Sequence, residues 1–123
     1  MEIKVDKYEN YSIAKISDEK VDSALSADLK SEFMTLHQDG VRNLILDMSD
    51  VKYVDSSGLS ALLVGNRSFT AEGAFVLYGV TDHVMKLITI SQIDKVMTVV
   101  AGKEEAVDFV FMSTIEKGSG SAE

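Results

Sequence analysis

Residues 43–63 constrain the fold more than any other part of the chain, because they join a buried strand to the start of a helix. The segment opens with the branched apolar run Leu44-Ile45-Leu46, which is short enough to be an interior strand. A polar turn leads to Asp55-Ser56-Ser57-Gly58, and a helical repeat of leucines begins at Leu59. Such a junction places backbone N–H groups and the positive end of the helix dipole around Ser56.

The rest of the chain alternates between strand and helix patterns. Strands are expected at 2–7, 11–16, 74–80 and 96–100, in addition to the strand that contains Leu46. Helices are expected from Ser23 or Ser26 to Gly40, at 57–72, after Thr81 and at 103–112. This order predicts an α/β fold with a mostly parallel five-stranded sheet and about four helices. The first two strands form a hairpin, so the first strand is expected at an edge and antiparallel.

Length and composition indicate one domain, over residues 1–115, followed by a flexible Gly- and Ser-rich tail at 116–123. The chain has no cysteine, which excludes disulfides, thiolate metal sites and a cysteine nucleophile. Its formal net charge of -8 argues against nucleic acid or an anionic membrane as the main partner. No apolar run approaches the length of a membrane span, and the N-terminus is unlike a signal peptide. A cytoplasmic location is expected.

The serine-rich junction does not match a hydrolase motif. Val54 stands where the first glycine of a nucleophile elbow would be, and the only histidines, His37 and His83, are interpreted as surface residues. A nucleotide-binding loop is equally unsupported, because no Gly-Lys-Ser/Thr sequence follows the junction. The acidic residues Asp47 and Asp50 lie beside turns, where carboxylates usually form turns rather than bind metal. No cofactor or metal is therefore expected.

Phosphorylation is the remaining chemistry for this junction. A phosphate on a serine at a helix N-terminus gains from the dipole and from free N–H groups, while adding roughly two negative charges. The simpler interpretation is that Asp55, Ser56 or Ser57 is only a helix cap, and single-residue chemistry favours it. Small side chains also line one stripe of the helix, including Gly58 and Gly65; we interpret them as tight packing onto a strand in preference to a docking groove.

The core Asp55-Ser56-Ser57-Gly58-Leu59, with the strand before it and the helix after it, resembles the signature of STAS domains, specifically the anti-sigma-factor-antagonist family. The resemblance covers about residues 2–115, because the order of the predicted elements also matches. It implies the STAS fold for the domain.

The resemblance also implies site residues. Ser56 matches the family's phosphorylated serine, and Asp22 matches its acidic residue in the loop after the second strand. That loop usually begins with a glycine, where this chain has Ser17, a departure that bears on partner choice. The expected partner-binding surface also includes Asp55 and residues of the helix that follows, of which Ser60, Val64 and Arg67 are expected on its outward side. The helix residues are Ser57, Gly58, Leu59, Ser60, Val64 and Arg67.

The resemblance implies that the chain is a non-enzymatic switch, an anti-sigma factor antagonist. Its unphosphorylated form would bind an anti-sigma factor that is also a serine kinase, and so free a sigma factor. The kinase would phosphorylate Ser56 and release the chain, and a PP2C-type phosphatase would restore it. One alternative is a STAS subunit of another assembly, such as a stress-signalling scaffold or a lipid-transport complex. The other is a small α/β enzyme with Ser56 as its nucleophile.

Overall fold

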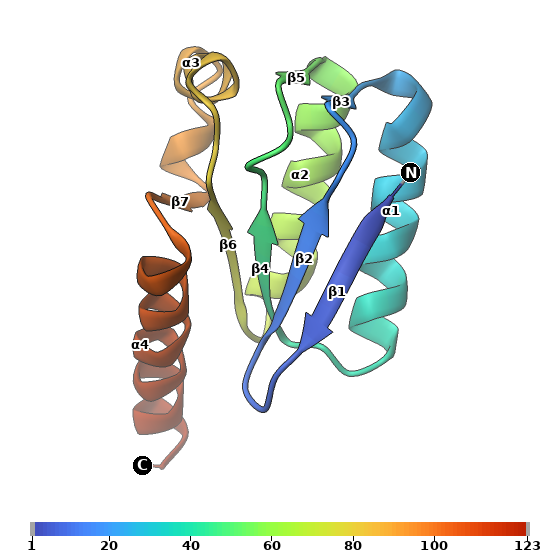
Figure 1. Ribbon diagram of the computed structural model, residues 1–123. Helices are drawn as coiled ribbons and strands as arrows, with labels where there is room; N and C mark the ends of the chain where they lie inside the picture. Colours follow the sequence, from blue (N-terminus) through green and yellow to red (C-terminus); the bar gives the residue numbers. More distant parts are fainter. Residues whose placement is uncertain (1, 123) are drawn as a thin grey trace.

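The computed structural model describes residues 2–122 and contains the predicted mixed sheet (Figure 1). The strand order is β1-β2-β4-β6-β7, with β1 antiparallel to β2 and the other neighbours parallel. The edge position and antiparallel direction of the first strand are thus confirmed. The five strands are β1 (Ile3–Lys7), β2 (Ser12–Ile16), β4 (Asn43–Asp47), β6 (Ala74–Tyr78) and β7 (Thr98–Val100).

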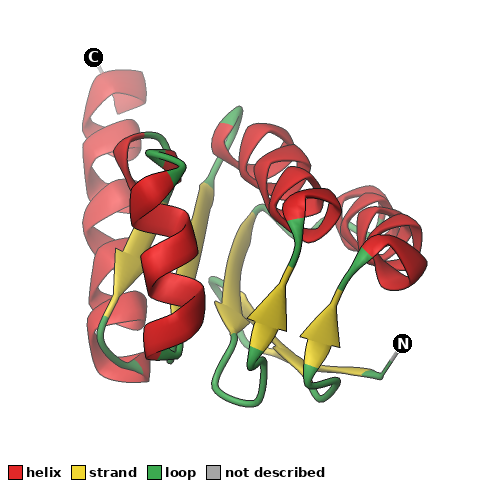
Figure 2. Cartoon of the chain, turned by 90° about the horizontal axis from the view of Figure 1, so that it is seen from above, coloured by secondary structure: helices red, strands yellow, loops and turns green. Residues whose placement is uncertain are grey.

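Helices cover both faces of the sheet (Figure 2). α1 (Ser23–Gln38) and α2 (Ser56–Thr70) lie side by side on one face, and α4 (Lys103–Ala122) packs on the other. Strand alternation explains the two layers: Leu46 belongs to the larger core with α1 and α2, whereas its neighbour Ile45 belongs to a smaller core with α4. α3 (Asp82–Ile90) joins the larger core.

Three phenylalanines fill the larger core where α1, α2 and β6 meet. The ring of Phe75 lies edge-on to Phe33, with centroids 5.5 Å apart, and is stacked with Phe69 at 6.0 Å. A Cβ atom at Gly65 would lie only 2.6 Å from the ring of Phe33. Gly65 therefore permits the close approach of α1 to α2. Its packing partner is mainly α1 rather than the strand that was predicted, although the ring of Phe75 on β6 would also lie 3.0 Å from the added Cβ.

A second, smaller sheet was not predicted from the sequence. It consists of β3 (Lys20–Val21) and β5 (Tyr53–Val54), which pair in parallel. Val21 and Val54 are buried, while Lys20 and Tyr53 are exposed. Two-residue strands are too short to produce a recognisable alternation, and Lys20 belongs to a mostly polar segment.

The N-cap of α1 differs from the two residues that were predicted for it. Asp22, rather than Ser23 or Ser26, caps α1: its backbone is extended and its Oδ1 accepts a hydrogen bond from Ala24 N at 3.1 Å. Thr81 occupies the N-cap position of α3, but its hydroxyl donates to the carbonyl of Val51 at 3.0 Å. That hydrogen bond ties α3 to the turn before β5.

Element ends also differ. β6 ends at Tyr78 rather than at position 80, because Gly79 has a φ of +69° that interrupts the strand. The last helix was predicted to end at Met112 but continues to Ala122, through most of the segment predicted as a flexible tail. Extending an existing helix fixes one residue for each hydrogen bond gained, so a helix can continue past Val110, which is fully buried against the sheet.

Candidate functional site

One carboxylate organises the junction between β5 and α2. Asp55 is the N-cap of α2, and its Oδ1 accepts a hydrogen bond from Gly58 N at 2.9 Å. Its other oxygen, Oδ2, accepts from Ser23 N at 3.1 Å, and Ser23 is the first residue of α1. A single side chain thus satisfies backbone donors at the starts of two helices.

The two serines that follow Asp55 differ in exposure. Ser56 is the first residue of α2 and is exposed, whereas Ser57 is partly buried. The side chain of Asp55 caps α2, so Ser56 does not provide the N-cap of this helix. A phosphate at this position would lie at the positive end of the α2 dipole, close to the N–H groups of the first turn.

Gly58 and Leu59, both predicted as partner-binding residues, lie beneath the surface. A methyl group at Gly58 would overlap the carbonyl oxygen of Val21 and would lie 2.7 Å from Val54 Cγ1. Leu59 is 8% exposed and belongs to the larger core. The absence of a side chain at Gly58 lets the small sheet lie on the first turn of α2, the turn that begins with Ser56.

Two of the three residues predicted on the outward side of α2 are exposed. Ser60 and Arg67 are exposed, as expected. Val64 is half-buried and lines a hollow of about 440 Å³ between α1 and α2, together with Phe33 and Met34. Val64, which was predicted on the outward side of α2, is thus partly covered by α1, unlike Ser60 and Arg67.

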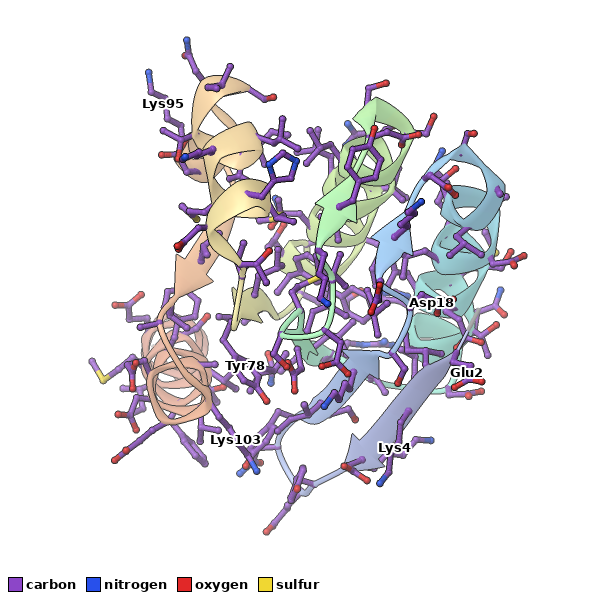
Figure 3. The ribbon with its side chains drawn as sticks, turned by 45° about the horizontal axis from the view of Figure 1, so that its top comes forward. Glu2, Lys4, Asp18, Tyr78, Lys95 and Lys103 are labelled. Atoms are coloured by element: carbon purple, nitrogen blue, oxygen red, sulfur yellow. The ribbon has the colours of Figure 1, made fainter. Side chains whose placement is uncertain are left out.

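The loop between β2 and α1 reaches the same end of the molecule. Asp22 caps α1 there, at the end where β3 and β5 also lie (Figure 1). Asp18 Oδ1 accepts a hydrogen bond from Glu2 N at 2.8 Å, and the two residues lie side by side in Figure 3. The carbonyl of Glu19 accepts from Lys52 N at 2.7 Å and Tyr53 N at 3.0 Å. The bonds to Glu19 hold the loop against the turn that leads to Ser56, whereas the bond to Asp18 ties it to the residue before β1.

Tyr53 and His83 are surface residues of this end that the sequence interpretation did not include in the site. The Tyr53 side chain is 43% exposed and stacks on the ring of His83, with centroids 6.2 Å apart and an interplanar angle of 19°. His83 is exposed, as predicted, but it is not an isolated surface side chain. The aromatic residue shortly before Asp55 was the available indication, and its partner on α3 was not visible in the sequence.

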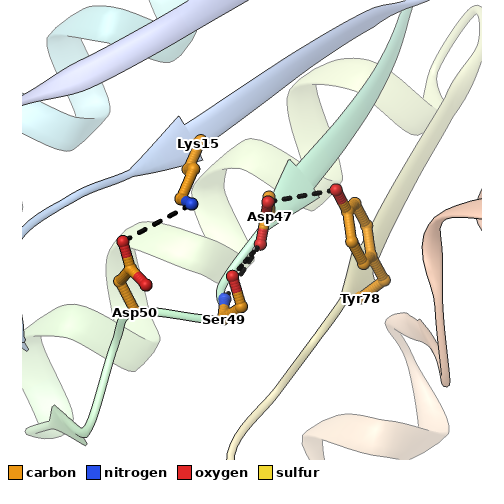
Figure 4. Close-up of polar contacts among 5 residues, drawn as sticks. All are labelled: Lys15, Asp47, Ser49, Asp50 and Tyr78. Atoms are coloured by element: carbon orange, nitrogen blue, oxygen red, sulfur yellow. Dashed lines mark hydrogen bonds and ion pairs between the residues drawn. The ribbon is translucent and has the colours of Figure 1, made fainter.

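A polar cluster holds the end of β4 (Figure 4). Asp47 is 9% exposed; its Oδ2 accepts from Tyr78 Oη at 3.0 Å, and its Oδ1 accepts from Ser49 N at 2.9 Å and Ser49 Oγ at 2.7 Å. Burial, followed by the bond to Asp47, raises the pKa of Tyr78 to about 12. Beside them Lys15 pairs with Asp50 at 3.5 Å. Asp47 thus fixes the turn that follows β4.

This arrangement supports the interpretation of the acidic residues as turn and cap formers. Asp47 holds a turn and Asp55 holds two helix starts. Within residues 2–122, the side chains of histidine, aspartate and glutamate form no group of three that could bind a metal ion. Nor does any helix in that range have both the length and the apolar character needed to cross a membrane.

Comparisons with known proteins agree with the fold. The sequence matches the family model of the STAS domain over residues 2–106. Three similar solved structures are an anti-sigma factor antagonist from Mycobacterium paratuberculosis, an anti-sigma-factor antagonist (STAS) domain protein from Planctomyces limnophilus, and Bacillus SpoIIAA in its phosphorylated form.

Each of these structures is similar along nearly its whole length. The mycobacterial protein is 19% identical, with a TM-score of 0.80 over 89% of this chain and 92% of its own. The Planctomyces protein is 19% identical, with a TM-score of 0.78 over 88% and 97%. SpoIIAA is 20% identical, with a TM-score of 0.66 over 89% and 99%. At such identities the likeness is one of fold.

Proposed function

Since the chain belongs to the STAS domain family, we propose that it is an anti-sigma factor antagonist whose binding is switched by phosphorylation of Ser56. The unphosphorylated form binds an anti-sigma factor that is also a serine kinase, and the sigma factor is thereby released. Phosphorylation of Ser56 ends the interaction, and a PP2C-type phosphatase restores it. The similar folds of anti-sigma factor antagonists support this proposal, among them SpoIIAA, whose structure is known in an unphosphorylated and a phosphorylated form.

The observation that carries the proposal is the exposure of Ser56 at the start of α2. A kinase can reach this hydroxyl without unfolding the helix. The neighbouring Ser57 is partly buried and is a poorer acceptor. The ATP and the catalytic groups belong to the kinase, while this chain contributes the hydroxyl, the helix that carries it and the loop beside it.

The charge change explains how phosphorylation weakens binding. A phosphoserine adds about 1.5 to 2 negative charges at neutral pH. The α2 dipole makes this charge tolerable in the free chain. In the complex, the phosphate would be buried against the partner, close to the carboxylate of Asp55, and a buried charge without a counter-charge is costly. The switch therefore changes binding more than it changes stability.

The site of modification is tested by incubating the chain with candidate kinase-type anti-sigma factors and ATP, followed by mass mapping. We expect phosphate on Ser56 in the wild-type chain, none on Ser56→Ala, and wild-type incorporation on Ser57→Ala. Phosphate that persists on Ser56→Ala would assign the site to another hydroxyl. Labelling of Ser56 by a fluorophosphonate probe would instead favour the hydrolase alternative.

A further inference from the structure

We propose that Tyr53 and His83 form an aromatic anchor that binds the same kinase-type anti-sigma factor as the Ser56 region. This inference rests on the proposed function and extends the partner's contact area from α2 to β5 and the first turn of α3. The anchor would enter an apolar pocket on the partner. The unphosphorylated chain would then be held by two neighbouring contacts, of which only one is altered by the phosphate.

The backbone fixes where Tyr53 points. Tyr53 and Val54 form β5, in which alternation turns Val54 into the core, 1% exposed, and leaves Tyr53 43% exposed. Pairing with β3 holds this short strand, and Tyr53 N donates to the carbonyl of Glu19 at 3.0 Å. The exposed ring is therefore carried by a rigid element close to Ser56.

His83 fixes the ring itself. Its imidazole stacks on Tyr53 with centroids 6.2 Å apart. α3 is in turn held by Val84 and Ile88, which are fully buried, and by the hydrogen bond from Thr81 to Val51. A side chain that is already ordered loses less conformational entropy on binding, and this favours its use as an anchor.

The position and chemistry of the pair point to the same partner. β5 and the first turns of α2 and α3 lie at one end of the molecule (Figure 1). A protein that covers Ser56 would therefore also contact the Tyr53 ring, which is stacked on His83. Tyrosine is among the residues that contribute most to binding energy when a partner encloses it. The nearby charges of Glu19 and Lys52 are paired with each other at 3.4 Å, so neither charge needs a counter-charge from the partner.

The opposite end of the sheet offers a matched control. Tyr8 follows β1 in the hairpin turn, is 46% exposed and is stacked on Tyr11 with centroids 4.9 Å apart. It is similar to Tyr53 in exposure and is likewise stacked on another ring, although Lys103 Nζ also lies 5.9 Å from its centroid, and it lies far from Ser56. A general effect of removing a stacked surface tyrosine would appear equally at both positions.

The test measures the affinity of unphosphorylated variants for immobilised kinase-type anti-sigma factors from the source genome. We expect Tyr53→Ala to bind about tenfold more weakly or worse, and His83→Ala to show a smaller loss. Tyr53→Phe keeps the ring and should stay within about threefold of wild type, and Tyr8→Ala within about twofold. Once Tyr53 is alanine, removing His83 should add little, because the two act as one unit.

The outcomes separate this inference from the proposed function. If the wild-type chain binds a kinase and Tyr53→Ala binds it with the same affinity, the anchor alone is overturned. A wild-type chain that binds none of these kinases would overturn the proposed function and the anchor together. Thermal unfolding of each variant checks the fold. If Tyr53→Ala alone unfolds at a lower temperature, the affinities of Tyr53→Ser and Tyr53→Phe are compared in its place. Equal affinities of these two variants for the kinase would also overturn the anchor.

Discussion

The carboxylate of Asp55 accepts a hydrogen bond from the backbone N–H of Ser23, 3.1 Å away and 32 positions earlier in the sequence. The same carboxylate caps α2 through Gly58 N. The residue that precedes the candidate phosphorylation site therefore fixes the start of α1 as well as the start of α2. This bond makes the loop that carries Asp22 and the helix that carries Ser56 parts of one rigid surface.

Replacing Asp55 by alanine should destabilise the fold. The change removes an N-cap and leaves a second backbone donor without its acceptor, so we expect a loss of about 1–2 kcal/mol in the free energy of unfolding. Asp50→Ala is the control, because it removes only a half-exposed ion pair with Lys15 and should cost less than about 1 kcal/mol. Urea unfolding measures both, and equal losses would mean that the two caps contribute no more than one surface ion pair.

A methyl group at Gly58 should be destabilising even though alanine is the better helix former. The helix gains about 1 kcal/mol in propensity from this change. The added Cβ would overlap the carbonyl of Val21, however, and we expect overpacking to dominate with a net loss of about 1–3 kcal/mol. At Gly102 the nearest atom to a new Cβ is a flexible Glu105 oxygen at 3.4 Å, so Gly102→Ala should be almost neutral. A stabilised Gly58→Ala would contradict the packing described for β3 and β5.

The parts of this fold that were predicted from sequence are those with a clear hydrophobic pattern, above all the strand and the helix that residues 43–63 join. The apolar run around Leu46 and the leucine repeat that begins at Leu59 indicate a buried strand followed by a helix, and the order of elements then dictates a parallel sheet. The strands β3 and β5 were missed, since two residues carry no period. The cap at Asp22 was missed because nearby serines are equally good caps by residue type.

The candidate site was predicted less completely than the fold, for a physical reason. Ser56 lies within a continuous sequence pattern, whereas the bond from Asp55 to Ser23 and the stack of Tyr53 on His83 join distant segments. Such contacts depend on how the elements pack, which local patterns do not encode. The same holds for Val64, whose burial is set by the position of α1.

Tyr78 should make stability depend on alkaline pH. Its pKa is raised from 10.0 to about 12 in the folded chain, so the folded state favours the protonated phenol. The stabilisation is complete below pH 10 and is lost as the pH rises through about 12. The unfolding free energy of the wild type, relative to Tyr78→Phe, should therefore fall across this window, while the other tyrosines cancel in the comparison. A constant difference from pH 9 to about 12 would show that Tyr78 titrates alike in both states.

The most direct test of the proposed switch compares the affinities of four forms of the chain for one kinase-type anti-sigma factor: unphosphorylated, phosphorylated, Ser56→Ala and Ser56→Asp. We predict tight binding by the unphosphorylated chain and by Ser56→Ala, and loss of binding on phosphorylation. Ser56→Asp should show an intermediate loss, since aspartate carries less charge and fewer oxygens than phosphoserine. Equal affinities for the unphosphorylated and phosphorylated chains would contradict the switch.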